Sequence, residues 1–255
     1  MKIADQLNRF HPLPRLLQDR VLLITGAGQG LGQALALAAA DLGATIILHG
    51  RSSAKLEKTY DAIVAANGAT PAIAPLDFSK ASDQDFEQLA QTIRHEFGQL
   101  DGIVHCAAQL KQLQPLANET LDDWLNLLRV NLAAPFALTR ACLSMLKRSE
   151  NGSVIFVSES HGVTPKAYWG GFAVSKFALQ GLLQVWRDEL SSAEKLRMNI
   201  VVPGPFNSPQ RTLTHPGEDK SALTPVEDIL PAFIYLLAEE SKTISGQVIE
   251  LAQRS

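Results

Sequence analysis

Short apolar runs rich in β-branched residues alternate with Ala- and Leu-rich helical patterns, and this alternation limits the possible folds more than any other feature. Strands are predicted over residues 21–25, 45–48, 72–76, 102–106, 153–158, 197–202 and 247–251. Helices are predicted between them, over residues 31–42, 53–66, 83–97, 120–146, 170–190 and 225–238. Because parallel strands need crossover connections, the sequence predicts an α/β fold, a doubly wound sheet of seven parallel strands with helices on both faces.

The length of 255 residues fits one domain over residues 20–255, preceded by an arm over residues 1–19. The formal net charge is −3 and no run of Lys or Arg occurs, so nucleic acid and membrane are not expected partners. No apolar stretch is long enough for a membrane span, and the arm lacks the apolar core of a signal peptide. Cys106 and Cys142 fit no disulfide framework or metal-ligand spacing. We therefore expect a cytoplasmic protein, without metal, that acts on a small molecule.

A glycine-rich turn joins the first predicted strand to its helix, with the pattern T-G-x-x-x-G-x-G over residues 25–32. Glycines let the backbone approach a pyrophosphate, and the start of the helix adds free amides and a favourable dipole. No lysine follows these glycines, which excludes the mononucleotide P-loop. The turn favours a dinucleotide site in a Rossmann-type sheet, the alternative being a tight structural turn. The candidate coenzyme residues in it are Gly26, Gly28, Gln29, Gly30, Leu31 and Gly32.

The end of the second predicted strand bears on the choice of coenzyme. Residues 49–53 read H-G-R-S-S and contain no carboxylate that could accept the ribose 2′-hydroxyl of NAD(H). Arg51, next to Ser52, can instead form a forked pair with a 2′-phosphate. The sequence therefore favours NADP(H) over NAD(H), the alternative being that Arg51 is a solvated loop cation.

The chain resembles the short-chain dehydrogenase/reductase family over residues 20–251, on motifs that follow the family's order. After the glycine turn come Leu-Asp at 76–77, His-Cys-Ala-Ala at 105–108 where the family usually has Asn-Asn-Ala-Gly, Asn at 131, Ser-Lys at 175–176 and Pro-Gly at 203–204. Residues 169–178 resemble a bacterial branch of uncharacterised oxidoreductases. The resemblance implies hydride transfer between the coenzyme and a carbonyl or alcohol substrate, in a homodimer or homotetramer. It also implies coenzyme contacts by Asp77, Phe78, Ala107, Lys176, Pro203, Gly204 and Ser208.

The chain departs from this family at its catalytic residues. The family's proton-donating Tyr, four residues before the Lys, corresponds to Phe172, which has no hydroxyl. The family's Ser corresponds to Glu159, although Ser158 and Ser160 could supply a hydroxyl after a small shift of register. The resemblance assigns the retained Lys to the nicotinamide ribose and the retained Asn to a bound water. The candidate catalytic residues are Lys176, Asn131, Glu159, Phe172, Ser158 and Ser160.

Three other groups could replace the missing phenol. Tyr168 lies one helical turn before Phe172, but the two glycines at 170–171 argue against a helix that begins early enough. Glu159 could donate a proton if it is buried beside an apolar ring, which nearby Lys176 would oppose. His161 is the third group, and for each of the three a structural role is the alternative. Three functions stay open: a slow oxidoreductase, a non-catalytic NADP(H)-binding protein and a structural subunit that binds no nucleotide.

Pro135 marks an irregular point in the long predicted helix. It lacks the N–H that would bond to the carbonyl of Asn131, four residues earlier. The resemblance implies that this free carbonyl holds a water beside the Lys; the alternative is that the proline only bends the helix.

Apolar residues recur at helical spacing in two of the predicted helices. They are Trp124, Leu127, Leu128, Leu182, Leu183 and Trp186. Such a stripe usually packs in a core, while the family resemblance implies pairing of these helices between subunits. A Pro- and Gly-rich segment over residues 203–223 is predicted as an irregular loop, long enough to cover a substrate.

Overall fold

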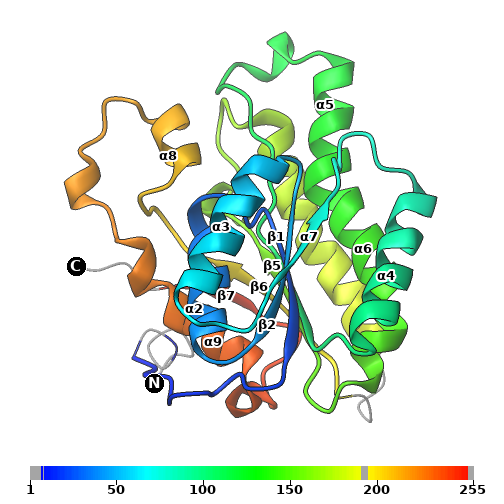
Figure 1. The fold of residues 1–255 in the computed structure, drawn as a ribbon. Coiled ribbons are helices and arrows are strands. Elements are labelled where there is room, and N and C mark those ends of the chain that lie inside the picture. The colour runs from blue at the N-terminus through cyan, green and yellow to red at the C-terminus, as the bar shows by residue number, and fades with distance from the viewer. Residues whose placement is uncertain (1–6, 8, 191–194, 252–255) are drawn as a thin grey trace.

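The computed structural model describes residues 7, 9–190 and 195–251, which form a single parallel sheet covered by helices on both faces (Figure 1). The sheet has seven strands in the order β3-β2-β1-β4-β5-β6-β7, and every neighbouring pair is parallel. The strands are β1 (Val21–Thr25), β2 (Thr45–Gly50), β3 (Ala72–Pro75), β4 (Gly102–His105), β5 (Ser153–Val157), β6 (Arg197–Val202) and β7 (Val248–Glu250). The doubly wound parallel sheet predicted from the sequence is confirmed.

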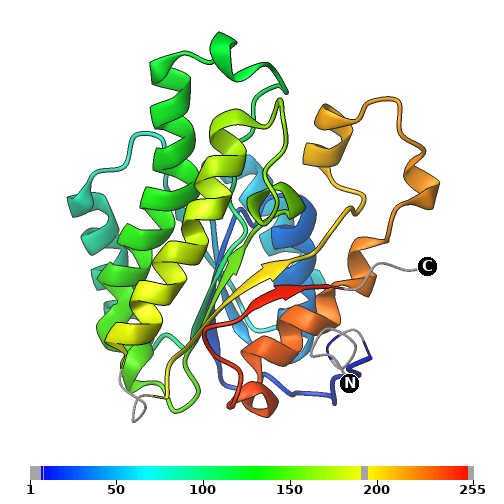
Figure 2. The same cartoon turned by 180° about the vertical axis from the view of Figure 1, so that it is seen from behind.

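The strands are buried because alternate side chains enter two separate apolar cores. In β1, Leu22 and Ile24 belong to one core, whereas Val21 and Leu23 belong to the other. The first core lies under α2 (Gly30–Asp41), α3 (Ser53–Ala65) and α9 (Leu230–Leu237), and the second under α4 (Asp83–Phe97), α6 (Ala134–Arg148) and α7 (Gly170–Glu189). Figures 1 and 2 show α6 and α7 side by side. This double burial explains why the strands read as continuous apolar runs rather than as alternating ones.

The helix predicted over residues 120–146 is interrupted in its middle. The segment α5 (Leu121–Leu128) passes into a π-helical turn over Arg129–Ala133 and then into α6. Because Pro135 has no N–H, the regular hydrogen bond to the Asn131 carbonyl cannot form there. The long helix predicted from the sequence is thus two helices joined by a π-helical turn, which lies at the irregular point that Pro135 marks.

The segment over residues 203–223 is more ordered than its Pro- and Gly-rich sequence suggests. It contains α8 (Pro209–Thr214) and a 3-10 turn over Lys220–Ala222, so the prediction of an irregular loop was wrong here. The Ser208 hydroxyl caps α8 by accepting a hydrogen bond from the Arg211 N–H at 3.1 Å. A Ser followed by a Pro is a recognised start signal for a helix, and the sequence analysis overlooked it.

The remaining element bounds agree with the predicted ones to within two residues, except that α9 begins at Leu230 rather than at residue 225. A 3-10 turn over Val226–Asp228 precedes this helix. No helix in the described ranges is both long enough and apolar enough to cross a membrane.

The described part of the N-terminal arm packs against the domain. Leu7 and Leu17 are fully buried in the first core. The Leu17 N–H donates to the Leu42 carbonyl at 2.9 Å, and the Phe10 ring meets the ring of Tyr235 edge-on at 5.0 Å between centroids. The arm therefore helps to close the core between α2 and α9, away from the carboxyl ends of the strands.

Candidate active site

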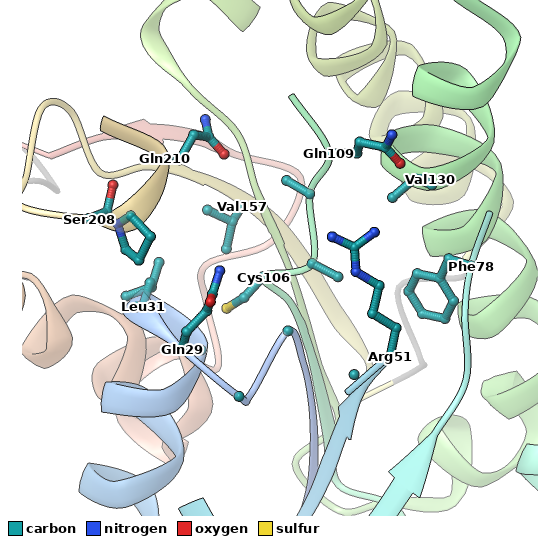
Figure 3. A pocket seen from close by; sticks show the side chains of 18 of the residues that line it. Gln29, Leu31, Arg51, Phe78, Cys106, Gln109, Val130, Val157, Ser208 and Gln210 are labelled. Carbon is teal, nitrogen blue, oxygen red and sulfur yellow. The ribbon is translucent and has the colours of Figure 1, made fainter. Parts of the chain in front are cut away.

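A cavity of about 290 Å³ opens at the carboxyl ends of the strands, where the strand order reverses between β1 and β4. Doubly wound sheets bind ligands at this point, because the loops after the two strands diverge and leave a crevice. Figure 3 shows side chains converging on it from several directions, with Gln29 and Arg51 on the β1 and β2 side and Gln109 across from them.

Every residue assigned to the coenzyme lines this one cavity. These residues are Gly26, Gly28, Gln29, Gly30, Leu31, Gly32, Arg51, Ser52, Asp77, Phe78, Ala107, Lys176, Pro203, Gly204 and Ser208. They come from widely separated parts of the chain, and only the parallel sheet brings them together.

The glycine turn is tight enough to require its glycines. Gly26 has φ +70°, and a Cβ there would lie 2.9 Å from the backbone nitrogen of Ala107. A Cβ on Gly32 would lie 2.5 Å from the Gly26 carbonyl oxygen. The residue before α2, Gln29, makes no side-chain cap, so the first amides of this helix are left for a ligand. The turn therefore fits a pyrophosphate group.

Two cations stand beside this turn. Arg51 follows β2, and Lys55 lies one turn further along, in α3; both line the cavity and both are exposed. The Lys55 ammonium donates a hydrogen bond to the side-chain carbonyl of Gln29, which links α3 to the glycine turn. Lys55 is not among the residues predicted from the sequence, although its place in the first turn of the helix after β2 could have revealed it. Together the two cations suit a phosphate on the ribose of the coenzyme.

A carboxylate and a histidine complete this end of the cavity. Asp77 accepts hydrogen bonds from the Ser79 hydroxyl at 2.8 Å and the Ser79 N–H at 3.0 Å. The hydrogen bond from the hydroxyl is the main cause that lowers the pKa of Asp77, and Arg51 makes a smaller contribution. His49 is buried and stacks on Phe78 with ring centroids 4.2 Å apart. Burial lowers the pKa of His49 to about 4, so the ring is neutral near neutral pH.

The opposite end of the cavity holds a buried cation and an aromatic ring. Lys176 of α7 is 4% exposed, and its ammonium donates to the Val157 carbonyl at 2.8 Å. Burial lowers the pKa of Lys176 to about 8, partly offset by attraction to Cys106 and Glu159. The Lys176 Nζ lies 5.9 Å from the centroid of the Phe172 ring. The position four residues before this lysine therefore offers an apolar ring and no hydroxyl.

The three residues after β5 differ in where they lie. Ser158 and Glu159 line the cavity, whereas Ser160 does not. The Ser158 hydroxyl is buried and has no hydrogen-bond partner in the described part of the chain. Of the two serines considered for a shifted register, only Ser158 therefore offers a hydroxyl to the cavity.

Glu159 is held in place by a neighbouring histidine. Its Oε2 accepts from the His161 N–H at 2.7 Å and lies 2.8 Å from the His161 Nδ1. The His161 ring stacks on Trp169 with 3.9 Å between ring centroids, and Trp169 packs on Phe172. This carboxylate is therefore a fixed feature of the cavity wall.

Asn131 lies behind the cavity wall rather than in it. The buried amide accepts from the Gln109 N–H at 2.8 Å and donates to the Gln109 carbonyl at 2.9 Å and to the Ser175 hydroxyl at 3.1 Å. Gln109 itself lines the cavity. The side chain of Asn131 therefore positions the loop after β4 against α7, while a water on its backbone carbonyl stays a prediction.

The idea that Tyr168 replaces the phenol is wrong. Tyr168 precedes α7, has φ +74° and is 60% exposed, and it does not line the cavity. The helix begins only at Gly170, and the Glu119 carboxylate accepts the Gly171 N–H at its start, at 2.9 Å. Tyr168 and Phe172 thus do not share a helix face.

The apolar stripes on α5 and α7 are mostly internal. Leu127, Leu183 and Trp186 are buried, and they pack inside the molecule. Other apolar residues of α5, α6 and α7 are exposed instead: Leu121, Leu125, Phe136, Val174, Phe177 and Val185. The prediction of a core stripe holds for these three residues and for Leu182, which is half-buried against the second core, whereas the exposed apolar surface is formed by residues outside the predicted stripe.

A parallel sheet with a glycine turn, two exposed cations and a buried lysine around one crevice defines a dinucleotide-binding protein of the short-chain type. Comparison with known proteins agrees. The family model for short chain dehydrogenase matches residues 20–218. The chain therefore belongs to the short-chain dehydrogenase family.

Individual relatives cover nearly the whole chain. An uncharacterized oxidoreductase of Escherichia coli K12, YciK, is 35% identical over 94% of this chain and 95% of its own length. A Shigella flexneri protein solved in complex with NADP is 35% identical, with a TM-score of 0.90 over 93% of this chain and 99% of its own. An Escherichia coli CFT073 protein solved in complex with NADPH is 36% identical, with a TM-score of 0.90 over 94% of this chain and 99% of its own.

Proposed function

We propose that this protein is an NADP(H)-dependent oxidoreductase that exchanges a hydride with a carbonyl or alcohol substrate. The observation that carries the proposal is the cavity itself, which has Arg51 and Lys55 beside the glycine turn at one end and Lys176 at the other. Bound NADPH would supply the hydride. The complexes of the two relatives with NADP and NADPH support this choice of coenzyme.

Different residues of the cavity bind different parts of the coenzyme. The glycine turn and the first amides of α2 bind the pyrophosphate, and Arg51 with Lys55 binds the 2′-phosphate. Asp77 approaches the adenine, Ser208 approaches the carboxamide, and Lys176 binds the nicotinamide ribose. Arg51 and Lys55 are both exposed, and the only side-chain hydrogen bond that either makes within the described residues is the one from Lys55 to Gln29. Few protein contacts are therefore lost when these cations bind a phosphate.

Reduction of a carbonyl needs a proton for the developing alkoxide, and Phe172 cannot supply one. General acid catalysis contributes about 10²–10⁴-fold, so turnover of neutral carbonyl substrates is expected to be slow by that factor. Ser158 and Glu159, which line the same cavity, are two groups that hold an exchangeable proton or accept one.

Titration with NADPH, followed by its fluorescence, tests the coenzyme site. The proposal predicts saturable binding, with NADPH bound at least about tenfold more tightly than NADH, since a charge-assisted pair with the 2′-phosphate contributes about 1.5–3 kcal/mol. Equal affinity for NADPH and NADH would contradict the role of Arg51, and no binding of either would contradict the proposal as a whole.

The second candidate function is a non-catalytic NADP(H)-binding protein. It is favoured by the replacement of two polar catalytic positions at once, by Glu159 and Phe172. The native protein, saturated with NADPH, is assayed on a panel of ketones and aldehydes. Measurable turnover of any of them supports the enzyme, whereas binding without turnover across the panel supports the second candidate.

The assembly we propose is a homodimer or homotetramer of a single-domain subunit, with residues 20–255 as the catalytic domain and 1–19 as its arm. The exposed apolar side chains of α5, α6 and α7 support it, since surfaces of this kind are usually covered in solution. Light scattering of the native protein and of Phe177→Asp tests it, because a charge at this half-exposed site would dissociate subunits that meet there. The free cysteines Cys106 and Cys142 support a reducing location, the cytoplasm.

A further inference from the structure

The end of the cavity near Lys176, here called the reacting end, differs from the family at two residues. Slow carbonyl reduction does not explain this difference. Where the family has two hydroxyls, this chain has the carboxylate of Glu159 and the ring of Phe172. If the two hydroxyls had simply been lost, the residues now at positions 159 and 172 would not be expected to share a chemical property. A carboxylate and an aromatic face share one: both attract cations.

The structure holds this carboxylate firmly. One of its oxygens, Oε2, is engaged by the backbone and the ring of His161, and that ring is held by stacking on Trp169. The Oε1 atom has no hydrogen-bond partner among the residues that the structure describes, and the Glu159 side chain is 22% exposed. Glu159 can therefore accept one more charged partner without giving up the contacts that fix it.

The ring of Phe172 faces a cation already. The Lys176 Nζ lies 5.9 Å from its centroid, within the range of a cation–π contact. Lys176 would repel a cationic ligand, and Glu159, close enough to attract the lysine, offsets that charge. The end of the cavity that would hold the reacting carbon thus contains one positive and one negative group, and its wall has no proton donor at position 172.

These features match the reduction of a carbon–nitrogen double bond rather than a carbon–oxygen one. In an iminium ion, hydride adds to carbon as a new C–H bond, and the π pair of the C=N bond becomes a lone pair on nitrogen. The product is a neutral amine and the coenzyme leaves as NADP⁺, so atoms and charge balance with no proton from the protein. A carbonyl treated in the same way gives an alkoxide, which does need a proton.

We propose that the substrate of this protein is a cationic iminium ion, with Glu159 as its counter-ion and Phe172 as the aromatic wall beside it. The proposal rests on the proposed NADP(H)-dependent hydride transfer and replaces the carbonyl with an iminium ion as the preferred substrate. Glu159 acts here by electrostatic stabilisation of the bound cation and does not transfer a proton.

The experiment compares a permanently charged iminium, N-methylpyrrolinium, with cyclopentanone, a neutral ketone of the same ring size. Both are assayed with the full-length protein and saturating NADPH, against a reaction without enzyme. The proposal predicts a kcat/KM at least about 100-fold higher for the iminium, because its reduction avoids the missing general acid. It also predicts that Glu159→Gln lowers kcat/KM for the iminium by about tenfold or more.

The control variant is Glu96→Gln, which removes the same charge from an exposed glutamate–histidine pair, Glu96 with His95. It should leave both activities unchanged. Glu159→Gln keeps a side-chain carbonyl for the His161 N–H, and its NADPH affinity, measured alongside, reports whether the site is still folded.

Equal kcat/KM for the iminium and the ketone would overturn the inference. So would an unchanged iminium activity in Glu159→Gln, or a parallel loss of ketone activity, which would make Glu159 a proton donor. Failure to reduce either compound while NADPH still binds also overturns it but leaves the coenzyme site standing, whereas failure to bind NADPH contradicts the proposed function itself.

Discussion

The two ends of the cavity differ in what they are made of. The coenzyme end consists of backbone that has no room for side chains, at Gly26 and Gly32, and of long exposed cations, Arg51 and Lys55. The reacting end consists of buried side chains, with Lys176 and Phe172 at 4% and 1% exposure. The first end comes from β1, β2 and α3, and the second from β5 and α7. Because the two ends use separate segments, the chain can change its chemistry without losing its coenzyme site.

The difference has an energetic side. An exposed cation stays hydrated in the free protein, so Arg51 and Lys55 contribute little to stability before the coenzyme binds. Lys176 is desolvated at all times, and its lowered pKa records the cost of holding that charge. At the reacting end, the charge of Lys176 that the proposed function needs therefore lowers the stability of the folded protein.

The largest expected effect comes from Lys176→Met. Added to a Phe172→Tyr protein, it should lower ketone turnover by more than about 100-fold, since it removes the cation of the reacting end. The same change should raise the free energy of unfolding at pH 7 by about 1–2 kcal/mol, the gain from removing a charge with a lowered pKa less the lost hydrogen bond to the Val157 carbonyl.

The sign follows from the direction of the shift. The pKa of Lys176 is about 8 when folded and near 10.5 when unfolded, so the charge destabilises the native state most below pH 8 and no longer does so above pH 10.5. Urea unfolding at pH 7 measures the effect, with Lys80→Met on the surface as the control. A Lys176→Met protein less stable than the native protein would contradict the claim that the buried charge of Lys176 destabilises the folded state.

His49→Phe should change how stability depends on pH. The folded pKa of His49 is about 4 against 6.5 in the unfolded chain, so its contribution is complete above pH 6.5 and is lost as the pH falls toward 4. The native protein should lose about 3 kcal/mol over this range from His49 alone, and the variant, which keeps the ring stack on Phe78, should not. Urea unfolding at pH 7 and pH 4.5 tests this, with exposed His95→Gln expected to behave like the native protein.

Arg51→Ala should affect coenzyme binding without affecting stability, unlike the changes at the reacting end. It should raise the Kd for NADPH by about 10–100-fold and leave the Kd for NADH and the free energy of unfolding unchanged, because Arg51 is exposed and acts only on the 2′-phosphate. Fluorescence titration measures it, and Arg94→Ala is the surface control. Weakened NADH binding would instead assign Arg51 to a part of the coenzyme that both nucleotides share.

The sequence predicted most of the sheet, because buried parallel strands are continuous apolar runs and several of them end at a glycine or a proline. The residues that it assigns to the coenzyme lie around one cavity, since the carboxyl ends of parallel strands meet at one edge. These features depend on local pattern and on the rules of strand connection, both of which can be read along the chain.

The sequence could not predict contacts made across the fold. That Glu159 is held by His161, and His161 by Trp169, depends on how the turn after β5 meets the segment before α7. Spacing puts Tyr168 on the face of Phe172 only if the helix begins early, which the two glycines argue against, and the left-handed backbone of Tyr168 leaves its side chain exposed. The link from Lys55 to Gln29 likewise joins segments that the sequence keeps apart.

The central claim is that the coenzyme end is intact while the reacting end lacks a proton donor at residue 172. Measuring ketone reduction by the native protein and by Phe172→Tyr, together with the NADPH Kd of each, tests it most directly. The account predicts at least about 100-fold faster reduction by Phe172→Tyr at an unchanged Kd, because one hydroxyl restores general acid catalysis. A native protein that reduces ketones as fast as the variant would contradict it.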